Sequence, residues 1–511
     1  MKIKVNCLLV MLVYSLTISD VYSLKILAVN PYQGKSHYFV FQPLLLELAK
    51  RGHNVTSISY FPLKQNIKNF TDISLAGSVK ILEDVFPIER SYKTVISIGM
   101  FLANFGTENC RELLRNEEVQ NVWKSKAKFD IILVEQFQSD CSLGLAYVLG
   151  APVVGMTSHT PLPWHFDRFG MPYNPSYVPF MFFDGGTKPS LYQRIEAFVF
   201  NAYFNTLYKF MQRTDQNTLA EYFDDVPPLE DLARDMKFLL LYKNPILFGS
   251  SLIPENVKEV NGYHVATPKP LSGDLKKFID EAEHGVIYIS FGSMLRATTT
   301  PRDKLEAIIS AVSELPQRIV FKWEEPNLPG NPKNIYVSNW LPQNDILAHP
   351  NVIAFYSHCG LLGTTEAIHH GVPVLGMPIF GDQPSNAAAV EESGLGVRID
   401  ITTLTKEELL SKFKIILDPK FRRKVKQISK AWHDRPMSAM DTAIYWIEYA
   451  VRNKDFNFRS PAADLPLYKY FNLDVIAIFT CIIYVLIYVI KSVFSLRKTQ
   501  SRKQSKKSKK A

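Results

Sequence analysis

Short, continuous apolar runs alternate with amphipathic stretches through both halves of the chain. Runs bounded by glycine, proline or polar residues predict buried strands, and they occur at 25–30, 129–134, 286–291, 352–357 and 372–377. Amphipathic stretches predict helices, of which the clearest are 38–51 and 361–370. Strands that alternate with helices in this way predict an α/β fold of two doubly wound, Rossmann-like domains with a cleft between them.

An apolar segment near the C-terminus predicts a membrane span. Residues 475–490 are unbroken apolar or aromatic, and Val493 with Phe494 extend the run beyond Lys491. The length approaches the ~20 residues that cross a bilayer. A basic tail follows directly, which favours a transmembrane helix at 475–494 over a buried helix and places the tail in the cytosol.

The N-terminus has the pattern of a secretory signal. Lys2 and Lys4 make a positive start, 7–18 form an apolar core, and a small-residue cleavage site ends at Ser23. With the C-terminal span, this predicts a single-pass type I protein whose body lies in a lumen. The expected organisation is signal peptide 1–23, first α/β domain 24–253, linker 254–284, second α/β domain 285–450, juxtamembrane segment 451–474, transmembrane helix 475–494 and basic tail 495–511.

The formal net charge of +9 would suit a nucleic-acid-binding protein if it were spread over the body. Eight Lys and Arg residues, however, lie after Leu496 in a tail without acidic residues. Subtracting them, 9 − 8, leaves +1 for the rest of the chain. The body is nearly neutral, so no nucleic-acid partner is expected.

The cysteine pattern does not suggest a disulfide-rich fold. Of five cysteines, Cys7 lies in the predicted signal and Cys481 in the predicted span, which leaves Cys110, Cys141 and Cys359. An odd count without a recurring spacing argues against a disulfide framework.

Two sequons, at Asn54 and Asn69, predict glycosylation in an exported protein. Asn54 opens a probable strand, so we expect Asn69 to be the occupied one.

The stretch 339–383 combines groups that suit a nucleotide sugar. Trp340 offers a flat surface for a base, and Gln343 places an amide three residues further on. A predicted strand then leads through His358 and Gly360 into a predicted helix. Such a helix start binds phosphate well, because free backbone N–H groups and the helix dipole both point at the ligand. An ordinary strand–helix–strand unit would explain the glycines alone but not the whole set of polar side chains.

Further polar residues follow other predicted elements. Glu366 lies within the helix that follows Gly360, and Asp382 with Gln383 follow the next strand, so that all three could bind sugar hydroxyls. Ser293, which follows the predicted strand 286–291, would add a hydroxyl and backbone N–H groups to a diphosphate.

This stretch resembles the signature of the UDP-glycosyltransferases, a family that transfers sugars from UDP to small lipophilic acceptors. The resemblance extends over nearly the whole chain and looks closest to the insect members. It implies uracil binding by Trp340 and Gln343, diphosphate binding by His358, ribose binding by Glu366, and binding of the donated sugar by Asp382 and Gln383. The residues themselves suggest that Ser293 and the backbone at Gly360 and Gly363 add further groups to the diphosphate site.

The signature departs from the family pattern at a few positions. Animal members usually carry glycine where Cys359 stands, although plant members carry cysteine. Leu362 and Gly363 replace the asparagine and serine of the plant motif, so contacts there would come from the backbone.

A histidine in the first domain is the candidate base. His37 falls at or just before the start of helix 38–51, where the positive helix end keeps an imidazole neutral and able to accept a proton. The resemblance implies a catalytic histidine in this loop. Such a base needs a carboxylate partner. The resemblance implies an aspartate just after strand 129–134; Glu135 holds the equivalent position, Asp140 follows five residues on, and both remain candidates.

Residues 157–212 are dense in aromatics and prolines, and 191–211 form an apolar helix candidate. Core packing explains about half of this pattern. The remainder suits an apolar acceptor pocket or contact with a membrane.

The resemblance implies the B-type glycosyltransferase fold, in which the first domain binds the acceptor and the second the UDP-sugar. The expected reaction is inverting transfer of a hexose, with glucose favoured, to a hydroxyl of a small lipophilic acceptor. It would give a β-glycoside, as in detoxification or in hormone or pigment conjugation. The expected partners are UDP-sugar, acceptor and a membrane crossed once; self-association is left open. No cofactor is expected, and no metal, because the sequence has no Asp-X-Asp triplet.

A second hypothesis is a membrane-tethered protein that binds UDP-sugar or a lipophilic ligand without turnover. The localisation expected under either hypothesis is the endoplasmic reticulum, because Lys507 and Lys509 near the C-terminus resemble a dilysine retrieval signal.

Overall fold

The computed structural model describes residues 23–82, 92–295 and 297–508, so most of the predicted signal peptide lies outside the described chain. Two compact units are present, one ending at Arg459 and one starting at Ser460. The first unit is called the body.

The first half of the body is built on a parallel sheet of seven strands in the order β3-β2-β1-β4-β5-β6-β7. Its strands are β1 (Lys25–Asn30), β2 (Asn54–Ser59), β3 (Phe70–Ser74), β4 (Ile131–Glu135), β5 (Val153–Met156), β6 (Phe238–Leu241) and β7 (Val257–Glu259). The helices are α2 (Lys35–Lys50), α3 (Tyr92–Arg115), α4 (Glu117–Lys124), α5 (Cys141–Leu149), α6 (Pro163–Phe169), α7 (Leu191–Leu219), α8 (Leu229–Arg234) and α9 (Pro245–Phe248).

The second half is a parallel sheet of six strands in the order β10-β9-β8-β11-β12-β13. Its strands are β8 (Val286–Ser290), β9 (Arg318–Lys322), β10 (Ile335–Ser338), β11 (Val352–Ser357), β12 (Val374–Gly376) and β13 (Gly396–Arg398). The helices are α10 (Gly273–Asp280), α11 (Arg302–Ser313), α12 (Gln343–Leu347), α13 (Leu361–His370), α14 (Gln383–Ser393), α15 (Lys406–Leu417), α16 (Pro419–His433) and α17 (Ala439–Arg452).

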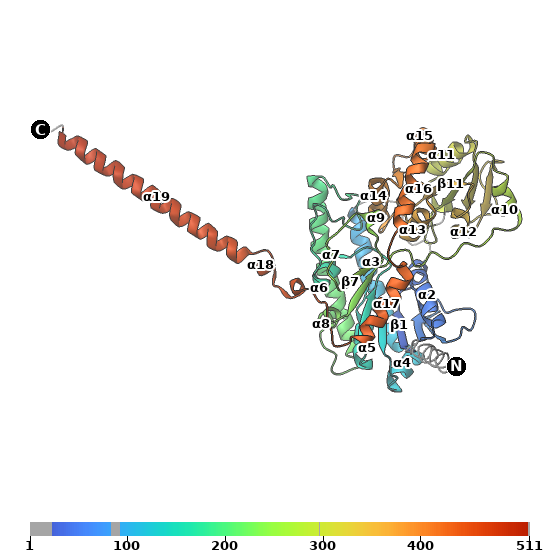
Figure 1. Cartoon of the computed structure of the whole chain (residues 1–511), viewed down its shortest axis with the longest axis horizontal. Helices are drawn as coiled ribbons and strands as arrows, with labels where there is room; N and C mark the ends of the chain where they lie inside the picture. The colour runs from blue at the N-terminus through green and yellow to red at the C-terminus, as the bar shows by residue number, and fades with distance from the viewer. Residues whose placement is uncertain (1–22, 83–91, 296, 509–511) are drawn as a thin grey trace, which may run out of the picture. The chain divides into compact units, whose positions relative to one another are not determined.

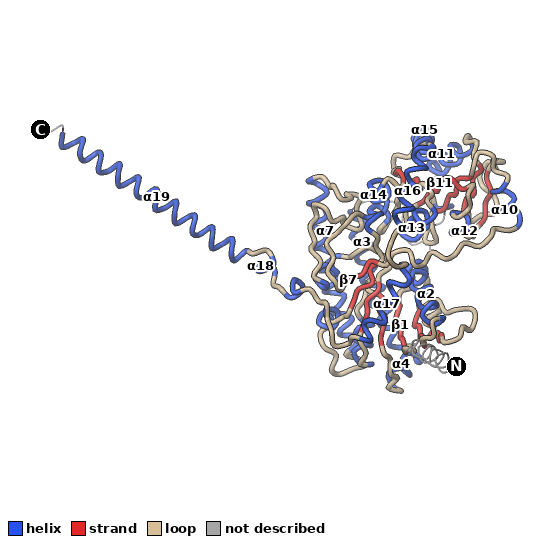
Figure 2. Tube along the Cα trace, viewed as in Figure 1, coloured by secondary structure: helices blue, strands red, loops and turns tan. Residues whose placement is uncertain are grey.

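Burial explains why the central strands are continuous apolar runs. Every residue of β4, β6, β8 and β11 is buried. Parallel strands with helices on both faces have no solvent-facing side, so they need apolar residues at every position. In Figures 1 and 2 the strands lie in the middle of each half and the helices lie outside them. The predicted pair of doubly wound domains is therefore confirmed.

The strand order places one switch point in each sheet. In the first sheet the order reverses between β1 and β4, which pair in parallel with Val29 opposite Val134. In the second it reverses between β8 and β11, where Ser290 lies opposite Ser357. Ligands of open α/β sheets bind beyond the carboxyl ends of the strands at such points.

Several predicted boundaries differ from the structure. The predicted linker 254–284 contains strand β7, which pairs with β6 at the edge of the first sheet, and helix α10. Helix α17, at the end of the predicted second domain, packs against α2, β4 and β6 of the first half. The position of α17 on the first half depends on contacts between residues far apart in the chain. One of them is the ion pair of Arg51 Nη2 with Asp441 Oδ1 at 2.6 Å. Local sequence patterns do not predict such contacts.

A disulfide lies in the first half of the body. Cys110 of α3 is bonded to Cys141 at the start of α5, across a sequence separation of 31 residues. Cys359 and Cys481 are free. Neither the odd cysteine count nor the spacing indicated this bridge, because it joins two residues that lie 31 positions apart on different helices.

The two sequons differ in exposure. Asn54 is exposed at the start of β2. Asn69 is partly buried, and its Nδ2 donates to Ala49 O at 3.3 Å. The preference for Asn69 stays a prediction.

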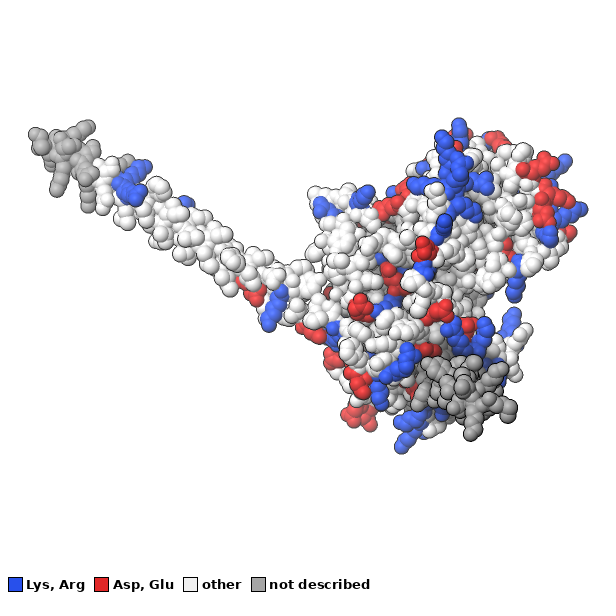
Figure 3. Space-filling view, viewed as in Figure 1, with Lys and Arg blue, Asp and Glu red and all other residues white. Residues whose placement is uncertain are grey.

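The second unit contains the short helix α18 (Leu467–Tyr470) and the long helix α19 (Leu473–Ser508). Among the described residues, one helical segment is long and apolar enough to cross a membrane, at 473–501. Its apolar side chains are exposed, and in Figure 3 its surface is almost free of charge until basic residues appear toward its end. It contains the predicted span 475–494. Lys509 of the proposed retrieval signal lies outside the described residues.

Candidate active site

A cavity of about 470 Å³ lies between the two halves of the body, at the carboxyl ends of both sheets. Residues of both switch points line it. Of the residues singled out in the sequence, the cavity is lined by His37, Ser293, Trp340, Gln343, His358, Gly360, Gly363, Glu366, Asp382 and Gln383. The sequence pattern thus identified ten residues that converge on one space from two domains.

The base candidate and a carboxylate meet at the first switch point. His37 occupies the first turn of α2, directly after the loop that follows β1, and Glu135 is the last residue of β4. His37 Nδ1 lies 2.7 Å from Glu135 Oε1. Glu135 is 5% exposed, so this hydrogen bond is shielded from water. Because a carboxylate can only accept, Nδ1 carries the proton and Nε2 carries the free lone pair.

Aromatic rings hold His37 in place. The rings of Tyr32 and Phe137 each lie 4.5 Å from the His37 ring, and that of His159 lies 6.0 Å away. Burial, together with the charge of His37, lowers the pKa of His159 to about 3. His159 is therefore neutral at physiological pH, and its Nδ1 lies 2.7 Å from the Thr160 carbonyl, to which it donates.

The other carboxylate candidate, Asp140, has a different partner. Arg168 Nη1 and Nη2 donate to Asp140 Oδ1 and Oδ2 at 3.1 and 2.8 Å, and Gln212 Nε2 donates to Oδ2 at 2.8 Å. Both members of the Asp140–Arg168 pair are 1% exposed. The alternative that Asp140 orients His37 is thus corrected, because the buried guanidinium occupies both of its oxygens.

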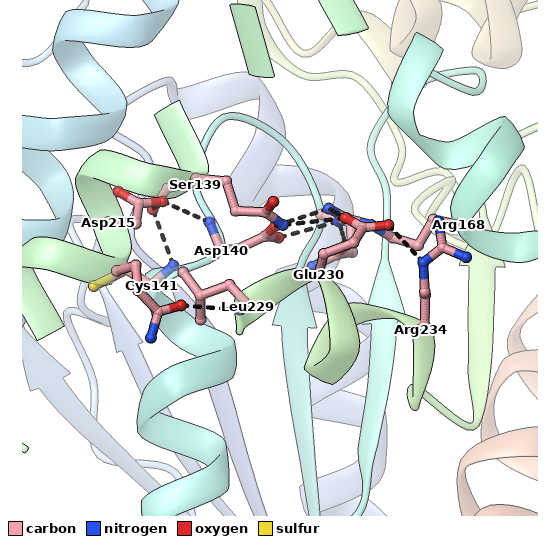
Figure 4. A network of polar contacts seen from close by, with 11 residues as sticks. Ser139, Asp140, Cys141, Arg168, Asp215, Leu229, Glu230 and Arg234 are labelled. Atoms are coloured by element: carbon pink, nitrogen blue, oxygen red, sulfur yellow. Dashed lines mark hydrogen bonds and ion pairs between the residues drawn. The ribbon is translucent and has the colours of Figure 1, made fainter. Parts of the chain in front are cut away.

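Asp140 belongs to the buried network drawn in Figure 4. Its backbone N–H donates to Asp215 Oδ2 at 2.9 Å, as does the Ser139 hydroxyl at 2.8 Å. Burial raises the pKa of Asp215 to about 8, against the effect of these hydrogen bonds. Glu230 accepts from Arg168 at 3.0 Å. This network joins α5, α6, α7 and α8 and supports the loop behind Glu135.

The second switch point forms a tight cradle around His358. A Cβ atom added at Gly292 or at Gly360 would lie 2.5 Å from His358 Nε2, so only glycine lets both backbones approach the ring. Burial, with a smaller effect of Lys322, lowers the pKa of His358 to about 4. The ring is therefore neutral, and the start of α13 at Gly360 lies beside it. This geometry suits a diphosphate.

Trp340, Gln343 and Glu366 line another part of the cavity. Trp340 is 61% exposed, which leaves indole surface open for stacking. Gln343 Nε2 donates to Glu366 Oε2. Burial raises the pKa of Glu366 to about 7, and this hydrogen bond opposes the shift. This hydrogen bond therefore links Gln343, the candidate for uracil binding, to Glu366, the candidate for ribose binding.

Asp382 and Gln383 begin helix α14. Gln383 Oε1 accepts from the backbone N–H groups of Ile379 and Phe380 at 2.8 and 3.1 Å. Asp382 Oδ2 accepts from Asn386 Nδ2 at 2.8 Å. Burial raises the pKa of Asp382, while Asn386 and the charge of His37 across the cleft oppose that shift. Asp382 and His37 thus line the same cavity from opposite halves of the body.

The structure adds cavity residues that the sequence reading missed. An apolar wall comes from Tyr32, Ile98, Leu102, Phe137, Met181 and Phe182. Ser158, His159, Lys35 and Lys322 add polar groups. Met181, Phe182, Ser158 and His159 fall in the region 157–212, whose aromatic content was a usable signal. No sequence signal marked Ile98 and Leu102, because the position of their side chains in the cavity wall depends on how helix α3 packs.

Comparisons with known proteins agree with this geometry. Residues 25–510 match the family described as UDP-glucoronosyl and UDP-glucosyl transferase. The chain is 38% identical to UDP-glycosyltransferase UGT5 of Dactylopius coccus over 93% of this chain and 92% of that one. It is 30% identical to UDP-glucuronosyltransferase 2B1 of Rattus norvegicus, over 92% and 94%. The glycotransferase of kitacinnamycin superposes with a TM-score of 0.57 at 17% identity, over 83% of this chain and 98% of that one.

Proposed function

Because the chain belongs to the UDP-glucoronosyl and UDP-glucosyl transferase family and is a UDP-glycosyltransferase, we propose that it transfers glucose from UDP-glucose to a hydroxyl of a small lipophilic acceptor. One observation carries the proposal. The His37–Glu135 pair of the first half and the donor candidates of the second half line the same cavity or adjoin it. A binding protein without turnover would not need an oriented base. The hydrogen bond between Glu135 and His37 therefore favours the enzyme over this alternative.

The proposed reaction begins with the acceptor hydroxyl against the apolar wall. His37 Nε2 takes its proton, and Glu135 stabilises the imidazolium that forms, as carboxylates do for catalytic histidines. The acceptor oxygen attacks the anomeric carbon on the side opposite the diphosphate. That carbon–oxygen bond forms as the bond to UDP breaks, so an α-linked donor gives a β-glycoside.

The leaving diphosphate gains negative charge during this step. His358, Ser293 and the backbone N–H groups at the start of α13 are the groups that would stabilise it. We propose that no metal ion is required, because the residues that carry these donors already line the cavity. Activity that survives thorough chelation would support this; loss restored by a divalent cation would overturn it.

The choice of glucose rests on relatives. The chain is 34% identical to UDP-glucosyltransferase 2 of Dactylopius coccus. Gln383 and Asp382 are the proposed partners of the sugar hydroxyls. The size and apolar lining of the other end of the cavity support lipophilic acceptors such as phenols and steroids.

We further propose a type I orientation in the endoplasmic reticulum, with the body in the lumen and the tail in the cytosol. The candidate span 473–501, the predicted signal peptide and the basic tail support it. Detoxification of lipophilic compounds would suit such a location.

The test is a screen for release of UDP by the full chain in detergent. UDP-glucose and UDP-glucuronate are compared side by side against a panel of phenols and steroids. Acceptor-dependent release with UDP-glucose is the expected result. Faster turnover with UDP-glucuronate would overturn the choice of sugar, and UDP binding without any turnover would restore the binding-protein alternative.

A further inference from the structure

Lys35 reaches across the cleft from the first half to the second. It is the first residue of α2, two residues before His37. Its Nζ lies 5.3 Å from the ring centre of Phe39 in its own helix and 4.9 Å from that of Trp340 in the other half. Lys35, Phe39 and Trp340 all line the central cavity.

The ammonium group of Lys35 has no carboxylate within ion-pair distance among the described residues. The other Lys or Arg side chain of the described cavity lining is Lys322, which is already engaged. Lys322 Nζ donates to Gly292 O at 2.5 Å and lies 3.7 Å from Glu324 Oε1. Lys35 is therefore the cation of this cavity that rests only on aromatic rings.

The cation–π contacts of Lys35 with Phe39 and Trp340 are weak and reversible. A cation over an aromatic ring is held only weakly at a partly exposed site. A charge-assisted hydrogen bond to a phosphate is stronger, and a lysine ammonium on a flexible stem can move to make one. An anion that enters the cavity would thus draw Lys35 away from Trp340.

We propose that Lys35 is a donor-binding residue supplied by the acceptor half, and that it pairs with the diphosphate of the bound UDP-sugar. This inference rests on the proposed function. The diphosphate needs a counter-charge, and Lys35 can supply it by leaving the Trp340 ring. Because Lys35 and His37 share the first turn of α2, the pairing also holds the base beside the donor.

The test measures binding without turnover. Full-length protein in detergent is titrated calorimetrically with UDP and with uridine, which lacks the diphosphate. The variants are Lys35→Met, Lys35→Arg and, as the matched control at the far end of the same helix, the exposed Lys50→Met. Lys35→Met should weaken UDP about 10- to 100-fold, as loss of a hydrogen bond to a charged group does. Uridine affinity should stay within about twofold, Lys35→Arg should retain most UDP affinity, and Lys50→Met should match wild type.

Salt dependence gives a second readout. UDP binding by wild type should weaken with added salt, and this dependence should be smaller in Lys35→Met, because one charge pair is missing. A merely structural role for Lys35 would not change the salt dependence.

Two results would overturn the proposal. If Lys35→Met weakened uridine and UDP equally, Lys35 would only support the Trp340 surface. If UDP affinity were unchanged, Lys35 would not contact the donor. Both differ from failure of the proposed function, in which wild type itself would not bind UDP.

Discussion

His37 Nδ1 lies 2.7 Å from Glu135 Oε1, although 98 positions separate the two residues in the sequence. The parallel pairing of β1 with β4 brings them together, because the chain leaves both strands at the same edge of the sheet. Glu135 ends its strand inside the sheet, so its carboxylate position is fixed by the strand register and not by a mobile loop. The hydrogen bond sets which nitrogen of His37 can act as the base.

The first prediction concerns this pair. His37→Ala should lower kcat about 10²–10⁴-fold with alcohol acceptors, the usual contribution of a general base, while affinity for UDP-sugar stays near wild type. Phenols should lose less, because they are more acidic. Glu135→Gln should reproduce most of the defect, and the double variant should add little. Steady-state kinetics with an alcohol and a phenol check this; full turnover by His37→Ala with an alcohol would refute it.

Asp140→Asn is the matched control for Glu135→Gln. It should leave kcat of the folded enzyme almost unchanged but lower the stability, because Arg168 loses a charged partner in a buried site. Removing one partner of a buried ion pair costs up to about 3–5 kcal/mol. Thermal unfolding separates the two variants: a kinetic defect at wild-type stability in Asp140→Asn would reverse the assignment.

Local sequence patterns located the elements of the donor site well. The strand Val352–Ser357 and the helix Leu361–His370 were predicted with the bounds that the structure has. Both depend on neighbouring residues: a fully buried apolar run, a tight turn and a helix stop at Gly371. The resemblance, together with the polar residues that follow the predicted strands, named the side chains expected to converge, and ten of them line the cavity.

Other features depend on contacts between distant segments, which no local pattern encodes. The choice between Glu135 and Asp140 required knowing that Arg168 comes from α6 to bind Asp140. The bridge between Cys110 and Cys141 required knowing that the fold brings the Cα atoms of these two residues to 5.5 Å, although they are 31 positions apart. For the same reason, Ile98 and Leu102 could not be assigned to the acceptor wall.

The second prediction concerns that disulfide. The Cys110→Ser, Cys141→Ser double variant should be less stable by about 2–4 kcal/mol, because a closed loop of this length restricts the unfolded chain. Thermal unfolding should show a lower Tm that no longer responds to dithiothreitol. Mass spectrometry of alkylated wild-type peptides provides the check: free thiols at both positions in protein purified without reductant would contradict the bridge.

The third prediction concerns topology. Protease added to sealed microsomes should remove only about 2 kDa, the mass of a tail of ~20 residues beyond a span of positive-inside orientation. Digestion of the body in intact vesicles would exclude the type I orientation. Replacing Lys507 and Lys509 by serine should let the protein reach the cell surface, whereas unchanged retention would exclude the dilysine signal alone.

The fourth prediction separates two roles of Gln383. Its Oε1 accepts from the N–H groups of Ile379 and Phe380, and we expect its amide N–H groups to bind the sugar. Gln383→Glu keeps an acceptor oxygen for the loop but removes both N–H donors. KM for UDP-sugar should rise about tenfold, while inhibition by UDP is unchanged. Gln383→Ala should show the same split and a loss of stability; equal weakening of UDP and UDP-sugar in both variants would reassign Gln383 to the loop only.

The last prediction uses the pKa of Glu366, which burial raises to about 7 in the protein without donor. Since this carboxyl titrates near 4.5 when unfolded, the folded state binds its proton more tightly. Its contribution to stability is therefore present below pH ~4.5 and is lost as pH rises through about 7.

Binding of the ribose should reverse this balance. Ribose hydroxyls that donate to Glu366 favour the ionised form, so binding should lower the pKa of Glu366 and release a proton near pH 7. Uridine is the suitable ligand, because it has the ribose but no phosphate that titrates in this range. Its affinity should rise between pH 6 and 8, and calorimetry in buffers of different ionisation enthalpy should detect up to about one proton released. Glu366→Gln should bind uridine without proton release and with little dependence on pH. Proton uptake by wild type, or the same pH dependence in Glu366→Gln, would mean that another group titrates and that Glu366 does not accept from the ribose.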